Sequence, residues 1–401
     1  MMAAIYAANS KAETIIVETN TAAGRKLLQT GRGRCNLTHA GGTIDDFIRA
    51  FGRRGRFLRY CFHEFTPEQI RGFFTERGLQ TKIEEDGSVF PVTDKASDVK
   101  KVLLAETEKL GVRFLYGRRV DRIERSGEDF TVYTNKQAIV AKKVIIATGG
   151  VSWPHTGSVG DGYRLARELG HEVVEQRASL VPLVTSQSWP GHLAGIAIGD
   201  VKISTMLDRK KVVFTGPMLF THDGIGGPAV LDLSSFLTDF LPAEKKAIDI
   251  TIDLVVDLGE NELERKILEQ FEGHPKKELV NILAGFVPRR LAVILCSEFG
   301  FEGNIYGSGL KKDERKRLVR ILKNLPLSIT TTRPIAEALV TRGGVSIEQI
   351  DTRTMESKIC PGLFFAGEVM DVDGPCGGYN LQICWSTGAI AGRSAGQQQG
   401  K

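Results

Sequence analysis

The fold is decided by residues 362–382, which read GLFFAGEVMDVDGPCGGYNLQ. The apolar run from Leu363 to Ala366 predicts a short buried strand. Gly367 follows it directly, and a glycine at such a strand end lets a ligand approach the backbone closely. The carboxylate of Glu368 can accept hydrogen bonds from sugar-like hydroxyls. This strand end is therefore a candidate ligand-binding site.

The second half of the stretch is a glycine turn that opens a helix. Gly377 and Gly378 precede a helix that is predicted from about Asn380 to Gly392. The first N–H groups of that helix and the positive end of its dipole face the same place as Glu368. A ligand with a polyhydroxyl chain on one side and an electron-rich ring on the other fits both features, and a flavin is such a ligand.

These motifs resemble those of a known family. Ala366-Gly367-Glu368 resembles the Ala-Gly-Asp signature of two-dinucleotide-type flavoproteins, and the run up to Gln382 resembles the bacterial flavoproteins that include YhiN, BaiN and aminoacetone oxidase. Four motifs in the same order extend the resemblance from Gly24 to Gly392. It implies an α/β fold with a Rossmann-like FAD-binding domain, an inserted β-rich subdomain and a helical subdomain. It also implies FAD as the cofactor and an FAD-dependent oxidoreductase as the function.

Domain boundaries are expected where the character of the sequence changes. Residues 1–185 and 342–401 are the two parts of the predicted FAD-binding domain. Residues 186–257 and 326–341 form the predicted β-rich insert, in which short apolar runs are separated by turns. Residues 258–325 are charged, are expected to be helical, and form the predicted helical insert.

Composition indicates a globular protein. Of its 401 residues, 42% are hydrophobic and 25% are charged, as in ordinary folded domains. The six cysteines form no Cys-x-x-Cys pair, which argues against a disulfide framework or a zinc site and favours a cytoplasmic location. No apolar run reaches the roughly 18 residues that span a bilayer, so no membrane partner is expected. The sequence indicates no oligomeric state.

The N-terminal region is typical of the second strand of a dinucleotide-binding fold. Small residues from Met1 to Ser10 predict a helix, and Thr14 to Val17 predict a buried strand that ends at Glu18. An acidic residue there binds ribose, about 20 residues after a Gly-x-Gly-x-x-Gly turn. We expect that turn and the central first strand on about 15 residues before Met1. Without that strand, neighbouring strand edges would stay unpaired. No other Gly-x-Gly-x-x-Gly occurs, so no separate NAD(P) domain is expected.

Residues 24–38, GRKLLQTGRGRCNLT, are a candidate anion-binding loop because fixed cations alternate with glycines. The loop resembles the family signature that follows the second strand. That resemblance assigns Arg25, Lys26, Arg34 and Asn36 to contacts with the diphosphate or the flavin. A solvated basic loop is the alternative. Cys35 has no cysteine neighbour, so a packing role is favoured over a redox role.

A further ligand-binding pattern is a strand that runs into a glycine turn. Residues 138–147 predict one buried strand that leads into Thr148-Gly149-Gly150. By resemblance, Val120 takes the position whose backbone meets the adenine. The complete set of predicted cofactor-binding residues is Glu18, Arg25, Lys26, Thr30, Gly33, Arg34, Cys35, Asn36, Val120, Thr148, Gly149, Gly150, Gly160, Asp161, Gly367, Glu368, Asp371, Gly377, Gly378, Tyr379, Asn380, Leu381 and Gln382. No metal site is predicted.

Two other features bear on the substrate. His222, in the run LFTHDGIGGPAVL at 219–231, is the candidate catalytic acid or base, with an ordinary structural histidine as the alternative. The run resembles a family motif that usually has Ser where Gly226 stands. Arg49, Arg53 and Arg56 recur at helical spacing among aromatics, which predicts one basic helical face. Such a face can bind RNA, whereas an amphipathic helix with its aromatic side in the core is the alternative.

Three hypotheses about function follow. The first is a small-molecule oxidoreductase that exchanges hydride with flavin N5, with NAD(P)H as a transient electron donor. The second is a flavin-dependent reductase of a uridine in ribosomal RNA, because YhiN-type relatives are associated with that reaction. The third is a flavin-free remnant or interaction protein, suggested by the first strand that is expected before Met1.

Overall fold

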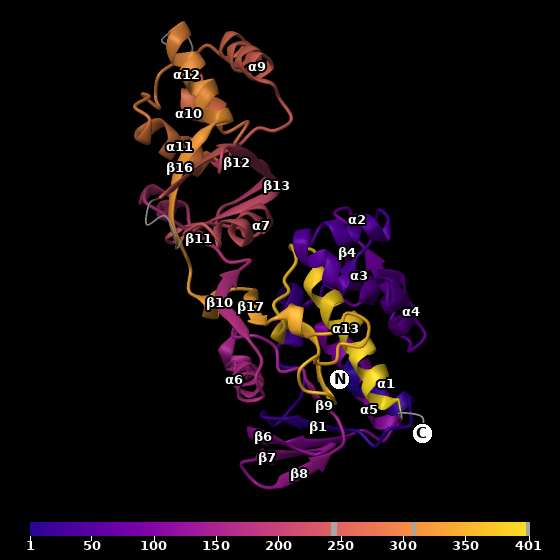
Figure 1. The fold of residues 1–401 in the computed structure, drawn as a ribbon. Coiled ribbons are helices and arrows are strands. Elements are labelled where there is room, and N and C mark those ends of the chain that lie inside the picture. Colours follow the sequence, from indigo (N-terminus) through magenta and orange to yellow (C-terminus); the bar gives the residue numbers. More distant parts are fainter. Residues whose placement is uncertain (242–246, 307–309, 398–401) are drawn as a thin grey trace. The chain divides into compact units, whose positions relative to one another are not determined.

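The computed structural model describes residues 1–241, 247–306 and 310–397, and it divides into two compact units (Figure 1). The first unit comprises Met1–Ser179 and Ile335–Lys401, so both ends of the chain build it. The second unit comprises Leu180–Pro334. Each unit has hydrophobic core clusters of its own.

Two parallel strand pairs form the centre of the first unit. β1 (Ile15–Glu18) pairs with β5 (Arg113–Tyr116), and β9 (Val144–Ile146) pairs with β18 (Leu363–Phe365). The strands predicted at the two ends of the chain are therefore present. Their predicted burial is wrong for β1, because all four of its residues are half-buried. The reason is that one side of β1 and of β9 lines a cavity that is described below.

Helices from opposite ends of the chain pack against each other. α1 (Met2–Asn9) lies along α13 (Tyr379–Gly396) (Figure 1). Small residues allow this close approach, because a Cβ on Gly392 would lie only 2.1 Å from the carbonyl oxygen of Ala3. α13 begins one residue before its predicted start and continues past its predicted end.

The strand predicted over 138–147 is two strands. β8 (Ala138–Ala141) belongs to an antiparallel meander with β6 (Val120–Ser126) and β7 (Asp129–Thr134), whereas β9 pairs with β18. The chain leaves one sheet and enters another at Lys142 and Lys143. A continuous apolar pattern cannot show this change, because both strands need apolar residues.

The predicted basic helical face is also wrong. The arginines lie on three elements, because α2 (Ile44–Arg49), a 3-10 turn (Gly52–Arg54) and α3 (Gly55–Glu64) follow one another. Gly52 has φ +55°, which interrupts the helix. Phe47, Phe51 and Phe57 are buried, as the alternative of an aromatic side in the core expected.

The remaining elements of the first unit surround these sheets. A three-stranded sheet contains β2 (Thr38–His39), β4 (Ser88–Pro91) and β3 (Thr81–Ile83). β10 (Val173–Ser179) pairs antiparallel with β17 (Val340–Val345). The other helices are α4 (Pro67–Thr75), α5 (Ala96–Lys109) and α6 (Asp161–Glu168).

The second unit is a closed six-stranded barrel with helices. Its strand order is β11-β14-β13-β12-β15-β16. The strands are β11 (Leu183–Thr185), β12 (Ala197–Leu207), β13 (Lys210–Thr221), β14 (Gly224–Gly226), β15 (Ile248–Asp253) and β16 (Leu325–Thr332). The helices are α7 (Pro228–Leu237), α9 (Glu260–Gly273), α10 (Leu279–Leu283), α11 (Arg289–Glu298) and α12 (Lys312–Lys323). Among the described helices of both units, none has the length and apolar character to cross a membrane.

Candidate functional site

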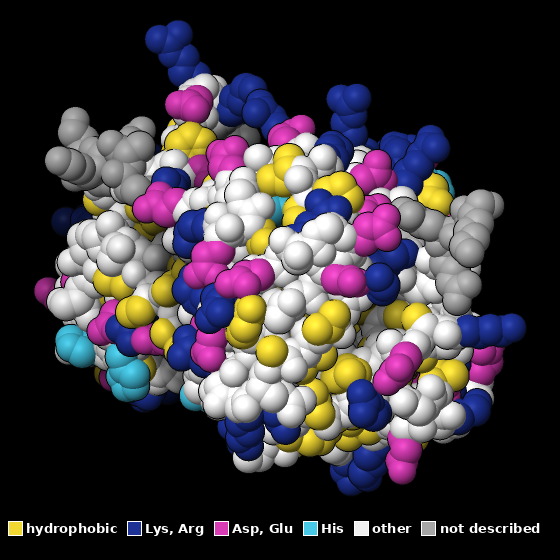
Figure 2. Space-filling view, turned by 60° about the horizontal axis from the view of Figure 1, so that its bottom comes forward, with side chains coloured by type: hydrophobic (Ala, Val, Ile, Leu, Met, Phe, Trp, Pro, Cys, Tyr) yellow, Lys and Arg dark blue, Asp and Glu magenta, His cyan; other side chains and the backbone are white. Residues whose placement is uncertain are grey.

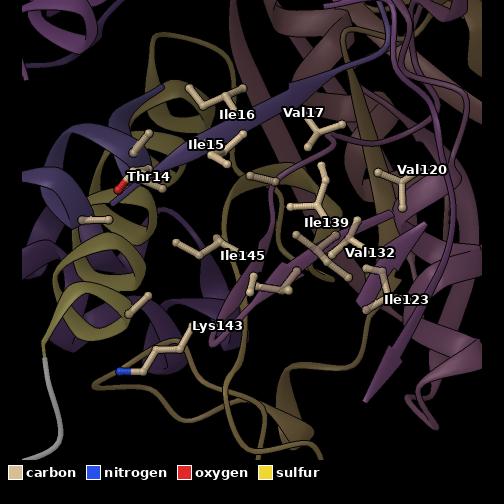
Figure 3. A pocket seen from close by; sticks show the side chains of 18 of the residues that line it. Thr14, Ile15, Ile16, Val17, Val120, Ile123, Val132, Ile139, Lys143 and Ile145 are labelled. Atoms are coloured by element: carbon tan, nitrogen blue, oxygen red, sulfur yellow. The ribbon is translucent and has the colours of Figure 1, made fainter. Parts of the chain in front are cut away.

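One cavity of about 1370 Å³ lies inside the first unit (Figure 3). Much of its wall is apolar and comes from Ile15–Val17 of β1, Ile145 of β9, and Ile123, Val132 and Ile139 of the meander. Glu18 is the last residue of β1, and Thr148 follows β9 closely, so both stand at carboxyl ends of strands. Ligands of open α/β sheets bind outside such ends.

Four predicted cofactor-binding residues from separate segments line this cavity, namely Glu18, Val120, Thr148 and Asp161. An Oε1 oxygen of Glu18 accepts hydrogen bonds from the backbone N and Nδ2 of Asn20, at 2.8 and 2.9 Å. Asn20 Nδ2 also donates to the carbonyl of Thr156 at 3.0 Å. These bonds hold the Glu18 carboxylate beside the loop that precedes α6.

Asp161, the first residue of α6, is held by Arg119. The Nε and Nη2 atoms of Arg119 donate to the two carboxylate oxygens at 2.9 and 2.6 Å. Gly160 caps this helix with φ +85°, which favours glycine. The neighbouring Gly162 permits close packing, because a Cβ there would lie 2.1 Å from Thr148 Oγ1. The strand end after β9 and the start of α6 thus meet closely.

A second cluster joins the basic loop to the strand end after β18. Lys26 Nζ donates to Glu368 Oε2 at 2.6 Å and to Ser152 Oγ at 2.8 Å. Glu368 Oε1 accepts bonds from Ser152 Oγ at 3.1 Å and from the backbone N of Thr341 at 2.9 Å. Gly150 leaves room for this arrangement, since a Cβ on it would lie 2.3 Å from Thr341 Oγ1 and 2.8 Å from Glu368 Oε1. The structure therefore brings together three predicted residues that are far apart in sequence.

Replacing Lys26 with Met is expected to lower the free energy of unfolding by about 1–3 kcal/mol, the range for a hydrogen bond to a charged group. The Glu368 carboxylate, with 14% of its side chain exposed, would lose its cation. Urea denaturation of the two proteins measures the difference. Lys101→Met is the matched control, because Lys101 pairs with Asp98 on the surface and is 77% exposed. If both substitutions lowered the free energy of unfolding equally, the Lys26–Glu368 pair would stabilise the protein no more than a surface ion pair does.

The other predicted residues of the basic loop lie in different surroundings. Arg34 is ion-paired with Glu84 and Asp94, and its guanidinium lies 3.8 Å from the centroid of the Phe90 ring. Asn36 donates to Ser88 Oγ at 3.0 Å. Arg25 and Gly33 are exposed, and Thr30 Oγ1 donates to the carbonyl of Leu27 at 2.6 Å. Any contact that these residues make with a cofactor stays a prediction.

The glycine turn before α13 is tightly enclosed. Gly377 and Gly378 have φ of +103° and +97°, and a Cβ on Gly378 would lie 2.2 Å from the carbonyl oxygen of Thr38. The ring of Tyr379 stacks between His39 and Phe47, with centroid distances of 4.7 Å to each. His39 Nδ1 also lies 3.2 Å from the carbonyl oxygen of Gly377. The backbone conformation of this turn is therefore constrained by its close contacts with Thr38 and His39 of β2.

The side chains of the first turns of α13 make hydrogen bonds and packing contacts within the protein. Asn380 Oδ1 accepts from the backbone N of Gly374 at 2.9 Å, and its Nδ2 donates to the carbonyls of Gly374 and Pro375. Gln382 is fully buried, accepts from Thr38 Oγ1 at 2.6 Å and donates to the carbonyl of Phe65 at 2.9 Å. Leu381 packs as a partly buried side chain. The cofactor contacts at these three positions stay predictions.

The acidic loop between β18 and α13 is bound by two arginines. Asp371 Oδ1 accepts from Arg54 Nη2 and from the backbone N of Gly343, both at 3.1 Å. Asp373 Oδ1 lies 3.2 Å from Arg342 Nε and 3.5 Å from Arg54 Nη1. Its other oxygen accepts from Ser179 Oγ at 2.7 Å. Asp371 was predicted to bind the cofactor, whereas Asp373 and both arginines were not recognised.

Burial controls the ionisation of several groups near the site. Desolvation raises the pKa of the Cys35 thiol to about 12. Desolvation, with a smaller contribution from Glu368, raises the pKa of Cys384 to about 11. Burial, again assisted by Glu368, raises the pKa of Tyr163. These groups stay protonated near neutral pH, so Cys35 is a packing residue here and not a thiolate nucleophile.

His222 lies in the second unit, on the exposed turn between β13 and β14. Its neighbour Asp223 is ion-paired with Arg333. At Gly226 a Cβ would meet Thr221 Cγ2 at 3.4 Å, an ordinary contact, so a side chain fits where the family motif has Ser. The catalytic role of His222 stays a prediction.

Sequence reasoning missed Ser152, Thr341, Asn20 and Arg119, which hold the predicted residues in place. It also missed His39, which stacks on Tyr379. The partners are distant in sequence, as the 342 positions between Lys26 and Glu368 show. Only the tripeptide Thr148-Gly149-Gly150, directly before Val151, marked the neighbourhood of Ser152 beforehand.

The fold and the relatives define the class of the protein, which is a flavoprotein oxidoreductase with a Rossmann-like α/β domain and a β-rich subdomain. The chain belongs to the family described as HI0933-like protein Rossmann domain, whose model matches residues 1–394. The fold class and the family that the motifs predicted are confirmed.

Two curated relatives match nearly the whole chain. A 3-dehydro-bile acid delta(4,6)-reductase of Clostridium scindens is 32% identical over 401 residues, which are 99% of this chain and 97% of that protein. A ribosomal RNA dihydrouridine synthase of Escherichia coli is 30% identical over 390 residues, 96% of this chain and 93% of that protein. Among solved structures, E. coli quinol fumarate reductase FrdA has a TM-score of 0.50 at 14% identity, covering 98% of this chain and 68% of FrdA. That likeness concerns the fold alone.

Proposed function

We propose that the protein is an FAD-dependent oxidoreductase that acts on a small organic molecule. The observation that carries this proposal is the convergence of Glu18, Val120, Thr148 and Asp161, from four segments, on one cavity. The printed name of the Clostridium scindens relative, a reductase of a bile acid, supports a small-molecule substrate.

The residues present fit FAD. Glu18 offers a carboxylate to the hydroxyls of a ribose, and Val120 lines the cavity where the adenine is predicted. Several glycines are needed for the backbone shape around these positions, since a Cβ on Gly157 would lie 2.5 Å from Asn20 Nδ2 and one on Gly150 would strike Thr341. The Lys26–Glu368 pair stands at the end of β18, where the flavin half is predicted.

When bound, FAD supplies a hydride acceptor or donor at flavin N5. The protein's own residues orient the cofactor and set its electrostatics. The positive end of the dipole at the start of α13 favours negative charge nearby, by about 0.3–1 kcal/mol. Lys26 adds a cation that Glu368 holds in place at 2.6 Å. NAD(P)H is proposed only as a transient electron donor, because the sequence offers no second dinucleotide fingerprint.

Replacing Glu18 with Ala is expected to weaken FAD binding about 10-fold, which corresponds to about 1.4 kcal/mol and the loss of one or two hydrogen bonds. Binding of FMN should not change, because FMN lacks the adenosine that Glu18 is proposed to hold. Fluorescence titration of the apoprotein with each flavin measures both affinities. Equal losses for FAD and FMN would show that Glu18 acts only through the loop at Asn20.

The proposed function is tested by reduction of the purified protein without oxygen. The protein is expected to take up FAD and to show flavin absorbance that bleaches when NADH, NADPH, a small amine or another reductant donates hydride. Reoxidation by steroid-like enones would then identify the acceptor class. A protein that remains colourless and takes up no added FAD would overturn the proposal and leave the flavin-free hypothesis.

A second candidate function is reduction of a uridine in ribosomal RNA. The name of the E. coli relative suggests it, and Arg49, Arg53, Arg56 and Arg59 are all exposed. Asp46 and Asp45 pair with Arg49 and Arg59. On the one face of the molecule that Figure 2 shows, basic and acidic side chains are interspersed. Buried Phe47, Phe51 and Phe57 cannot stack on bases. Salt-sensitive RNA binding that is lost in an Arg53→Ala, Arg56→Ala double variant would support this candidate.

A further inference from the structure

The strand β18, which leads to Glu368, is held along both of its edges. One edge pairs with β9. At the other edge, the backbone N of Ser357 donates to the carbonyl of Leu363 at 2.7 Å. Residues 355–360, here called the edge segment, therefore fix the position of β18 from the side that β9 leaves open.

The edge segment is itself held by one buried hydroxyl group. Ser357 Oγ accepts hydrogen bonds from the backbone N of Ile359 at 3.1 Å and from the backbone N of Cys360 at 2.7 Å. It also lies 2.9 Å from Nε2 of His171, and both residues are only 4% exposed. Met355 in the same segment has φ +61°, a conformation that residues other than glycine rarely adopt, so the segment depends on such contacts to keep its shape.

These hydrogen bonds determine the protonation state of His171. A hydroxyl oxygen has two lone pairs, and the two backbone N–H groups use both of them, so the Ser357 hydrogen is donated to Nε2. Nε2 must then lack a proton, and the neutral imidazole carries its proton on Nδ1. Within the described chain, Nδ1 is buried and has no hydrogen bond partner. A second proton would make Nε2 a donor that faces an oxygen without a free lone pair.

No neighbouring charge would compensate a protonated His171. Its backbone N donates to the carbonyl of Ala166 in α6 at 2.9 Å, and its ring lies edge-on to Phe365 of β18, with centroids 4.8 Å apart. Burial lowers the pKa of His171, and Gln349 raises that pKa by a smaller amount. In the part of the chain that the structure describes, His171 forms no ion pair with the ionisable residues of the last turn of α6, the adjoining position 172, the 3-10 turn Ile347–Gln349 and the edge segment, which are Arg167, Glu168, Glu172, Glu348, Glu356, Lys358 and Cys360.

We propose that His171 and Ser357 are a positioning pair for the flavin site, which holds β18 and the Glu368 carboxylate beyond its end only while His171 is neutral. This inference rests on the proposed function, because Glu368 is predicted to face the flavin. Protonation breaks the bond between the two side chains, frees the edge segment and lets the end of β18 move. Flavin binding is therefore acid-sensitive, although neither member of the pair is among the predicted cofactor contacts.

Protonation, flavin binding and folding are linked through this pair. If a proton on His171 weakens FAD binding about 10-fold, bound FAD must lower the pKa of His171 by about one pH unit, because the coupling is reciprocal. In the unfolded chain this histidine takes up its proton at the ordinary pKa of 6.5, whereas in the folded chain burial opposes protonation. The pair therefore stabilises the fold fully above pH 6.5, and this stabilisation is lost as the pH falls through the lower pKa of the folded state.

The pair is tested by a nuclear magnetic resonance titration of the His171 imidazole. In the flavin-free protein we expect His171 to titrate below pH 6.5. In the Ser357→Ala variant it should titrate at higher pH than in the unaltered protein, because Nε2 loses the donor that favours its neutral form. Saturating FAD should lower the pKa of His171 by about one further pH unit and leave that of the exposed His63 unchanged. Titration of His171 at or above pH 6.5 without flavin, or the same pKa with and without FAD, would overturn the proposal.

A variant without the titrating group provides the second test. His171→Gln keeps a side-chain oxygen that can accept from Ser357 but takes up no proton. Fluorescence titration with FAD, above and below the measured pKa of His171, should give a pH-independent affinity for this variant. The unaltered protein and the matched control His63→Gln should both bind FAD about 10-fold more weakly at the lower pH. Equal pH dependence of the two glutamine variants would show that His171 does not control binding. A protein that bound no FAD at any pH would contradict the proposed function instead, and the flavin-free titration would then decide whether Ser357 keeps His171 neutral.

Discussion

Replacing Asp373 with Asn is expected to lower the free energy of unfolding by about 3–5 kcal/mol, the range for removing one partner of a buried ion pair. Only 1% of the Asp373 side chain is exposed, and its carboxylate faces both Arg342, at 3.2 Å, and Arg54, at 3.5 Å. The amide of Asn is neutral and offers one oxygen where two now accept hydrogen bonds. Two guanidinium groups would therefore lose their shared counter-charge in a poorly solvated place.

The measurement is urea denaturation followed by far-UV circular dichroism, with the thermal midpoint as a second observable. The control is Asp121→Asn, which removes the same charge from an exposed side chain and is expected to change stability by less than about 0.5 kcal/mol. A loss of under 1 kcal/mol at Asp373 would mean that water reaches this cluster. In that case the arginines do not depend on Asp373 to hold the loop before α13.

Replacing Gly378 with Ala is expected to destabilise the protein by about 2–6 kcal/mol, of which backbone strain contributes 1–3 and overpacking another 1–3. At φ +97° an alanine is strained whatever the space around it. The new Cβ would also lie 2.2 Å from the carbonyl oxygen and 2.4 Å from the carbonyl carbon of Thr38. Either the turn or strand β2 must move, and the start of α13 moves with the turn.

Gly41→Ala separates the two causes. Gly41 has φ +108°, close to that of Gly378, but a Cβ there would have no atom within 4 Å. It should therefore show the strain alone, about 1–3 kcal/mol. Flavin absorbance of both variants adds a functional observable, because the turn at Gly378 is predicted to face the cofactor. If the two alanine variants unfolded alike, contact with Thr38 would have no cost and the turn would be more adaptable than its geometry indicates.

The helices and strands of the first unit could be predicted where a few consecutive residues determine them. Leu363 to Phe365, Ile15 to Glu18 and the helix after Gly378 were all recognised from apolar runs and glycine turns. The predicted arginine face failed because Gly52, with φ +55°, breaks the helix that the spacing suggested. The single strand predicted over 138–147 failed because periodicity does not reveal which sheet a strand joins.

The candidate site was predictable to a similar depth. Residue type alone marked Glu18, Lys26, Glu368 and the turn at Gly378. A carboxylate, an ammonium group or a glycine indicates what can be bound at a position before its neighbours in the fold are known. Their partners were not predictable, because Ser152 and Thr341 are common residues without a distinctive neighbourhood in sequence. Which carboxylate each cation meets depends on how distant segments pack.

By itself the sequence determined the family, the α/β class and the chemical types of residue in the candidate site, because short motifs impose backbone shape within a few positions. Only the tertiary structure decided that Lys26 meets Glu368 across 342 positions and that Asp373 lies between Arg54 and Arg342. It also decided that residues of β1 and β9 line a common cavity. Contacts between segments that are far apart in the sequence decide which charges and which strands pair. Local sequence patterns do not specify these contacts.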